Sequence, residues 1–107
     1  MPGRTKFDLI FAPETIEHLG AIDPKYHGNI ARVIDQQLLY SPESPTRNRK
    51  PLEVPGPEGT TWELRCGPQN RFRVFYDVSE TDREVHILAI GVKDRNKLFI
   101  AGKEYTP

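Results

Sequence analysis

Alternating hydrophobic and polar positions fill the second half of the chain and predict an antiparallel sheet. Residues 60–66 and 71–78 both alternate, and the face expected to be apolar carries Trp62, Leu64, Cys66, Phe72, Val74, Tyr76 and Val78. Residues 84–91 are almost continuously apolar, which is typical of a central strand covered on both faces. Polar turns at 67–70 and 79–82 separate these segments. We therefore expect three consecutive strands joined as a meander.

The first half of the chain predicts one strand and two helices. Residues 5–11 form the strand, with Phe7, Leu9 and Phe11 on one face and cover on both sides for part of its length. Pro13 opens a helix whose apolar stripe is Ile16, Leu19 and Ile22. Asp23-Pro24 opens a longer helix that runs to about residue 39, with a stripe formed by Ile30, Val33, Ile34 and Leu38. The Ser41-Pro42 pair ends it, because a residue before proline disfavours the α conformation.

Two segments are less defined. Residues 42–57 hold half of the ten prolines and predict a stiff connector that carries Arg47, Arg49 and Lys50. A loop of this length is either functional or a sign that an element has been missed. Residues 94–105 fit either a short helix or an edge strand. The order β-α-α-β-β-β predicts an α+β, two-layer fold, with a helical hairpin packed on one face of a mainly antiparallel sheet and the other face free.

Composition limits the kind of protein. A length of 107 residues, 36% of them hydrophobic, fits a single domain over 1–107. No apolar run is long enough to span a membrane and no secretory signal is visible, so we expect a cytoplasmic protein without a membrane partner. Cys66 is the single cysteine and no Cys/His spacing matches a zinc site, so we expect neither a disulfide nor a metal.

Charge is balanced overall, with 15 basic and 15 acidic residues, but it is segregated along the chain. Segments 8–35 and 77–84 each carry three more acidic than basic residues, whereas 47–73 and 93–103 each carry three more basic than acidic ones. If the two basic segments meet in space, they form a positive surface on a neutral protein.

Arg65 and Arg73 are the strongest candidates for binding chemistry. They lie on consecutive predicted strands joined by a tight turn, on the face away from the apolar side chains. Two guanidinium groups on neighbouring strands repel each other unless an anion lies between them. Phosphate is an anion whose oxygens suit their planar geometry. The alternative is that Glu63 and Asp77 neutralise them across the strands.

The other candidate residues each have a structural alternative. Glu63 is either a general base or a cross-strand ion-pair partner, and His86 is either an acid or base or a hydrogen-bonded core histidine. Lys93 and Arg95 follow the end of a strand and lie either at a functional rim or in solvent. Phe99 either stacks on a base or packs in the core. Phosphate loops, dinucleotide fingerprints, zincin helices and nucleophile elbows are absent, so neither a nucleotide cofactor nor another small-molecule cofactor is expected.

Three segments together resemble the RelE/ParE toxin superfamily: WELR at 62–65, RFRVFYDV at 71–78 and ILAIGVK at 87–93. The opening residues 7–14, the Ser41-Pro42 helix end and the KPL at 50–52 also fit. The resemblance implies the toxin of a bacterial type II toxin–antitoxin system, with a cognate antitoxin as partner. In the RelE branch, such a protein enters the ribosomal A site, cleaves mRNA without metal through the RNA 2′-hydroxyl, inhibits translation and arrests growth.

The resemblance also implies roles for individual residues. Arg65 and Arg73 match arginines that contact the scissile phosphate, and Lys93 falls near a further cationic catalytic residue. Thr61 and Glu63 replace two lysines of RelE itself, and Phe99 replaces a tyrosine. Proton transfer then falls to Glu63 or His86, and RNA binding to Arg47, Arg49, Lys50, Arg71, Arg95 and Phe99. Two alternatives stay open: a ParE-like gyrase inhibitor without RNA cleavage, and a decayed toxin that only binds its antitoxin.

Overall fold

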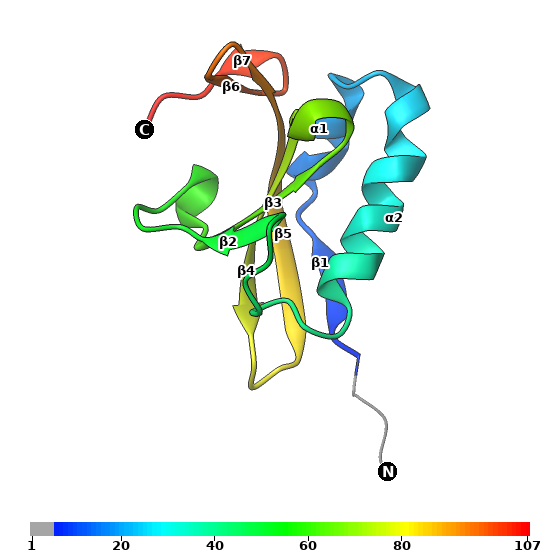
Figure 1. Ribbon diagram of the computed structural model, residues 1–107, viewed down its shortest axis with the longest axis vertical. Coiled ribbons are helices and arrows are strands. Elements are labelled where there is room, and N and C mark those ends of the chain that lie inside the picture. The colour runs from blue at the N-terminus through cyan, green and yellow to red at the C-terminus, as the bar shows by residue number, and fades with distance from the viewer. Residues whose placement is uncertain (1–5) are drawn as a thin grey trace.

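Two helices lie against one face of a seven-stranded sheet in the computed structural model, which describes residues 6–107 (Figure 1). The helices are α1 (Glu14–Gly20) and α2 (His27–Leu38), separated by a 3-10 turn at Pro24–Tyr26. The strands are β1 (Asp8–Phe11), β2 (Arg49–Pro51), β3 (Trp62–Cys66), β4 (Phe72–Ser79), β5 (Glu84–Asp94), β6 (Lys97–Ile100) and β7 (Lys103–Glu104). This α+β two-layer arrangement confirms the expected fold class.

The long strand β5 organises the sheet. Strands β2, β3, β4, β5, β6 and β7 lie in that order and pair antiparallel, whereas β1 pairs parallel with the first half of β5. The second half of β5 pairs with β6, so the tail that the pattern left undecided is a strand hairpin. The strand expected over residues 5–11 begins at Asp8, and Thr5 lies outside the described residues.

The core lies between the sheet and the helices. It contains the predicted apolar stripe of α2 and the expected apolar face of the meander, including Ile30, Ile34, Leu38, Leu64, Phe72, Val74 and Tyr76. Burial of these side chains is the main favourable term for folding, since each contributes roughly 1.5–3 kcal/mol. Asp23 caps the 3-10 turn at Pro24–Tyr26, where its carboxylate accepts a hydrogen bond from the Lys25 backbone N–H at 3.0 Å, whereas the long helix expected to open there begins at His27.

Of the expected inward stripe at α1, Leu19 and Ile22 are confirmed and Ile16 is wrong. Ile16 is 78% exposed, and the inward residues are Thr15, His18, Leu19 and Ile22. The Thr15 hydroxyl donates to the Ala12 carbonyl at 2.7 Å, and His18 Nδ1 accepts from the Ile90 N–H at 3.2 Å. These polar contacts decide which side of this short helix faces the sheet. Part of β1 was expected to be buried on both faces. This expectation is wrong, because Ile10 and Phe11 at the end of the strand are exposed.

The second face of the sheet is not free, contrary to expectation. Residues 52–60 fold back over its middle and bury Phe75 and Ala89, and a Cβ placed on Gly56 would lie 3.3 Å from the Phe75 ring. Figure 1 shows this segment on the side of the sheet away from α2. The proline-rich connector therefore contains the strand β2 and a segment that covers the sheet. The sequence pattern predicted neither, because the prolines indicated a connector without strands.

Candidate functional site

Strand register places the two predicted arginines directly opposite each other. Arg65 on β3 is the Cα partner of Arg73 on β4, and Arg73 is in turn opposite Gly91 on β5. Directly opposed residues point to the same face of a sheet. Gly91 has no side chain and is covered by Leu98 and Ile100, and the row of opposed residues continues through Ile100 to Lys103.

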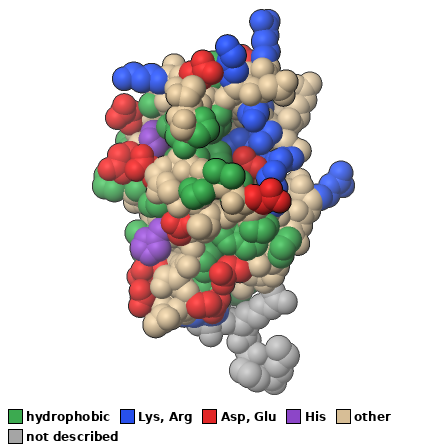
Figure 2. Space-filling model, turned by 90° about the vertical axis from the view of Figure 1, so that its left-hand side faces the viewer, with side chains coloured by type: hydrophobic (Ala, Val, Ile, Leu, Met, Phe, Trp, Pro, Cys, Tyr) green, Lys and Arg blue, Asp and Glu red, His purple; other side chains and the backbone are tan. Residues whose placement is uncertain are grey.

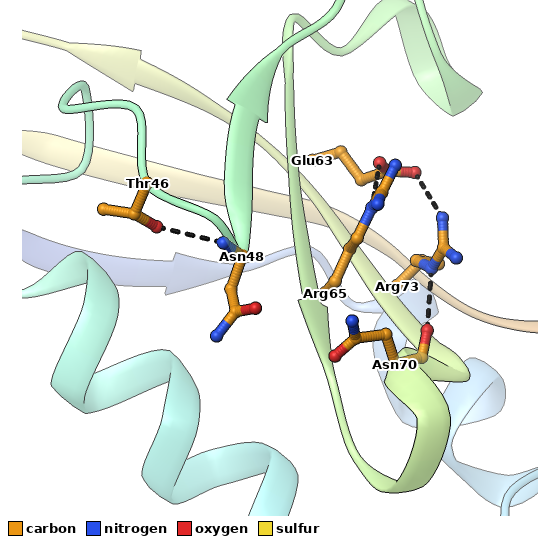
Figure 3. A network of polar contacts seen from close by, with 6 residues as sticks. All are labelled: Thr46, Asn48, Glu63, Arg65, Asn70 and Arg73. Atoms are coloured by element: carbon orange, nitrogen blue, oxygen red, sulfur yellow. Dashed lines mark hydrogen bonds and ion pairs between the residues drawn. The ribbon is translucent and has the colours of Figure 1, made fainter.

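One carboxylate joins the two guanidinium groups. Glu63 Oε1 lies 3.3 Å from Arg65 Nε, and Glu63 Oε2 lies 3.3 Å from Arg73 Nη1 (Figure 3). The Glu63 and Arg73 side chains are 10% and 13% exposed, and Arg65 is the most open at 33%. Arg73 Nε also donates to the Asn70 carbonyl at 2.9 Å. We call Glu63, Arg65 and Arg73 the arginine–glutamate cluster.

Neutralisation of the arginines by Glu63 was one of the two expectations, and the structure contains this ion pair. Asp77, the other expected partner, instead accepts hydrogen bonds from the Thr61 N–H and hydroxyl at 2.8 and 2.7 Å. The cluster therefore holds two positive charges and one negative charge. This excess leaves it able to attract an anion, since each guanidinium has further N–H donors.

Strand register places Lys50 and Lys93 near the cluster, whereas Arg71 and Arg95 lie farther from it. Lys50 on β2 is the register partner of Glu63, and Lys93 on β5 lies two residues after Gly91, where its N–H donates to the Arg71 carbonyl. Arg47 lies exposed in the connector, and Arg95 lies exposed in the β5–β6 turn. Arg71 extends over the Phe72 ring, 5.8 Å from its centroid. The two basic segments thus meet where β4 and β5 pair.

Three predicted site residues are not brought to the cluster. His86 lies five positions along β5 from Gly91, roughly 16 Å at the rise of a strand, and its Nε2 contacts Glu84 Oε1 at 3.0 Å. Phe99 is opposite Val92, which packs on the core, so Phe99 faces the helix layer. Arg49 is buried, and its guanidinium donates to the Ser44 carbonyl at 2.6 Å and to the Gln37 carbonyl.

Arg49 has a structural role rather than a role in binding, because its side chain is buried. Its side chain ties the connector to the C-terminal end of α2, and desolvation lowers the pKa of its guanidinium. Tyr76 also holds the connector, because its hydroxyl donates a hydrogen bond to the Pro42 carbonyl at 2.8 Å. Both groups hold the connector against the core.

Sequence reasoning missed Lys103 and His18. Lys103 joins the row of the arginines only through the β6–β7 hairpin, which no periodicity predicted. Strand β1 pairs with β5 as far as Ile87, and β6 pairs with it from Gly91 on. Between these two pairings, His18 Nδ1 accepts a hydrogen bond from the Ile90 N–H. The spacing of Thr15 and His18, three residues apart on a helix, indicates that both lie on one face. The expected face, which included Ile16, did not include them.

The basic side chains of this face gather at one end. Figure 2 views the molecule from the side opposite the helices, and its Lys and Arg side chains lie mainly at the top and upper right, whereas Asp and Glu side chains are spread over both halves. A positive field confined to one end attracts a polyanion although the formal net charge is zero. Among residues 6–107, no group of three His, Cys, Asp or Glu side chains could hold a metal ion. No helix among them is long and apolar enough to cross a membrane.

Comparison with known proteins supports the fold. A chain of the toxin–antitoxin complex RelBE2 from Mycobacterium tuberculosis superposes with a TM-score of 0.58 at 18% sequence identity, covering 79% of this chain and 95% of that one. No family model and no curated protein sequence matches the chain. The chain thus has the RelE-like fold that its sequence resemblance predicted, with two helices on a mainly antiparallel sheet.

Proposed function

We propose that this protein is the toxin of a toxin–antitoxin pair and cleaves mRNA on the ribosome without a metal ion. The observation that carries the proposal is the arginine–glutamate cluster, with two opposed guanidinium groups that share one carboxylate at 3.3 Å each. The fold shared with a chain of a toxin–antitoxin complex supports the toxin role. Action on the ribosome would place the protein in the cytoplasm.

The cluster has the groups that cleavage by a 2′-hydroxyl needs. The Glu63 carboxylate takes the proton of the 2′-hydroxyl, and the 2′-oxygen then attacks the adjacent phosphorus. Arg65 and Arg73 stabilise the negative charge that builds up on the phosphorane oxygens. The bond to the 5′-oxygen breaks, this oxygen leaves with a proton for which Lys93 is the candidate donor, and a 2′,3′-cyclic phosphate results.

Exchange of partners is the first step in this mechanism. Both guanidinium groups contact Glu63 in the free protein, and an incoming phosphate takes over part of these contacts. Glu63 is then released from one ion pair and faces the 2′-hydroxyl. Lys50, Arg47, Lys93, Arg71 and Arg95 contribute positive charge around the RNA backbone.

Substitution of Arg73 tests the proposal. Arg73→Ala removes one phosphate contact and one donor to the transition state, which typically costs 10²–10³ in rate. We expect loss of growth arrest on induction and loss of transcript cleavage, mapped by primer extension. Arg32→Ala is the matched control, because Arg32 is an exposed arginine on α2. Full toxicity of the Arg73→Ala protein, with a fold unchanged by circular dichroism, would contradict the proposal.

A second candidate function is inhibition of gyrase without RNA cleavage, or antitoxin binding alone. It is favoured by the engagement of both guanidinium groups by Glu63 and by the distance of His86 from the cluster. Intact transcripts together with DNA-damage signalling after induction would indicate the gyrase inhibitor. Intact transcripts without growth arrest would indicate a protein that only binds its antitoxin.

An antitoxin is the expected protein partner in either case. If a short reading frame adjacent to the gene encodes the antitoxin, its co-expression should abolish growth arrest and yield a complex on size-exclusion chromatography. Growth arrest that persists in the presence of every adjacent frame would count against the pair.

A further inference from the structure

Strand β5 contains one residue more than the stretch of β4 with which it pairs. Ala89 is opposite Phe75, whereas Ile87 is opposite the very next residue of β4. Leu88 is therefore the extra residue of a β-bulge. Successive side chains of a regular strand point to opposite faces, and an extra residue shifts this alternation. The bulge thus decides which face each later residue of β5 occupies.

Burial along β5 shows this shift. Ile87 before the bulge and Ile90 after it are both buried in the core between the sheet and the helices, although they are three positions apart. Alternation without the bulge would carry on from Ile87 and place Lys93 in the helix layer. With the bulge, Lys93 and Gly91 alternate with the core residues and lie on the face of Arg73, which is opposite Gly91.

The bulge lies where the edge of β5 away from β4 changes its partner. Strand β1 pairs with this edge up to Ile87, and β6 pairs with it from Gly91. The side chain of His18 on α1 enters this interval, and its Nδ1 accepts the hydrogen bond of the Ile90 N–H at 3.2 Å. A ring nitrogen therefore does at the bulge what the carbonyl of a neighbouring strand does elsewhere in the sheet.

The ring of His18 borders a cavity on each face of the sheet. A cavity of about 270 Å3 on the helix side is lined by His18, Val92 and Phe99, among others. A second cavity, of about 220 Å3, is lined by His18, Ala89 and Lys103, among others. A side chain that borders a cavity has fewer dispersion contacts there. The hydrogen bond to Ile90 is therefore the specific contact that joins this ring to the bulge.

We propose that His18 is a positioning residue: it holds the bulge and thereby fixes the part of β5 that presents Lys93 to the arginine–glutamate cluster. This inference rests on the proposed function, in which Lys93 is the candidate donor of a proton to the leaving 5′-oxygen. His18 acts through the backbone of residues 88–90 and stays outside the reacting groups. The cluster itself lies on β3 and β4, so the loss of His18 leaves its phosphate contacts in place.

Proton transfer depends steeply on the position of the donor, whereas binding of the RNA backbone does not. A general acid typically contributes 10²–10⁴ in rate, and a displacement of about 1 Å can cost about 10². Loss of the His18 contact should therefore reduce the rate of cleavage and leave the affinity for RNA unchanged.

The test is single-turnover cleavage of a short mRNA on programmed ribosomes by the full chain. The rate at saturating protein and the protein concentration at half-saturation are measured separately. We expect His18→Ala to lower the rate about 10-fold to 100-fold and to leave the half-saturating concentration within about twofold. A loss that came only from unfolding would lower the amount of active protein and raise the half-saturating concentration.

Two amide variants separate positioning from general damage to the fold, also where His18→Ala does not fold. The side-chain oxygen of Asn takes the place of Nδ1, whereas that of Gln reaches the place of Nε2. His18→Asn should thus keep the contact with Ile90 and cleave within about threefold of the wild type, and His18→Gln should be about as slow as expected for His18→Ala. Hydrogen exchange at the Ile90 amide, measured by NMR without RNA, should be slow in the wild type and in His18→Asn and fast in His18→Gln.

A double-mutant cycle tests the route through Lys93. Lys93→Ala alone should lower the rate by about 10², and adding His18→Ala should lower it no further, because the group that His18 positions is already absent. Thr15→Val is the matched control. It removes the hydrogen bond from the Thr15 hydroxyl to the Ala12 carbonyl, which belongs to the same helix and does not involve β5, and should leave the rate unchanged.

Three results would overturn the inference and leave RNA cleavage standing. They are a wild-type rate in both His18→Ala and His18→Gln, equal rates for the Asn and Gln variants, and losses at His18 and Lys93 that multiply in the double variant. Absence of cleavage by the wild type on programmed ribosomes would refute the proposed function together with the role of His18.

Discussion

At the scale of single residues, burial changes the chemistry of the one cysteine. Cys66 lies on β3 next to Arg65, with its thiol in the core, and desolvation raises its pKa to about 11 although Arg73 acts in the opposite direction. A thiol in the unfolded chain ionises near 9. The unfolded state therefore loses this proton first as pH rises, and the folded state loses stability over that interval.

We therefore expect the free energy of unfolding to decrease between about pH 9 and 11, and to decrease less in Cys66→Ala. Urea denaturation at several pH values measures this difference. Tyr76, whose pKa is also raised by burial, keeps part of the alkaline dependence in the variant. An identical pH dependence for the two proteins would show that the thiol is not desolvated.

At the scale of elements, the β5–β6 pairing depends on one glycine. A Cβ at Gly91 would lie 2.8 Å from the Phe99 carbonyl oxygen and 2.9 Å from Leu98 Cδ1. Gly91→Ala should thus force β6 away from β5 and cost about 1–3 kcal/mol. Hydrogen exchange should speed up over 97–104 and stay slow in β3 and β4.

Gly28 is the control for this prediction, since a Cβ there meets no atom within 4 Å and the residue lies in α2. Gly28→Ala should stabilise the protein by about 0.5–1 kcal/mol, because alanine loses less backbone entropy in a helix. Urea midpoints that move in the same direction for both variants would contradict the steric argument at Gly91.

Helices and strands could be predicted where their own residues carry the pattern. Strands β3 and β4 and helix α2 follow their own periodicity and β5 is a nearly continuous apolar run, so all four depend on local pattern alone. Strand β2 has three residues, one of them a proline, and is defined only by its pairing with β3. The inward face of α1 depends on the contact of His18 with β5, which no local pattern contains.

At the scale of the whole molecule, separation of charge matters more than net charge. The basic end of the sheet face opposite the helices should make RNA affinity salt-dependent although the protein is formally neutral. Each lost phosphate contact should reduce the slope of log K against log[salt] by about 0.7, the value for single strands.

Lys93→Ala and Lys103→Ala should each lower that slope by this amount, and Lys25→Ala, which removes an exposed lysine over the Tyr26 ring, should leave it unchanged. Fluorescence anisotropy with labelled single-stranded RNA between 50 and 200 mM salt, roughly the range over which such binding changes steeply, measures it. A slope near zero for the wild type would mean that this end of the face does not contact phosphate.

The amino-acid sequence alone determined the fold class, the meander, the core stripe of α2 and the pairing of Arg65 with Arg73. These features follow from alternation, helical spacing and the short turn between two strands, all of which are local. Only the tertiary structure decided the position of Glu63 between the arginines, the burial of Arg49 and the separation of His86 and Phe99 from the cluster. Strand register, the β5–β6 hairpin and the fold-back of residues 52–60 set these positions, and each depends on contacts between residues distant in the chain.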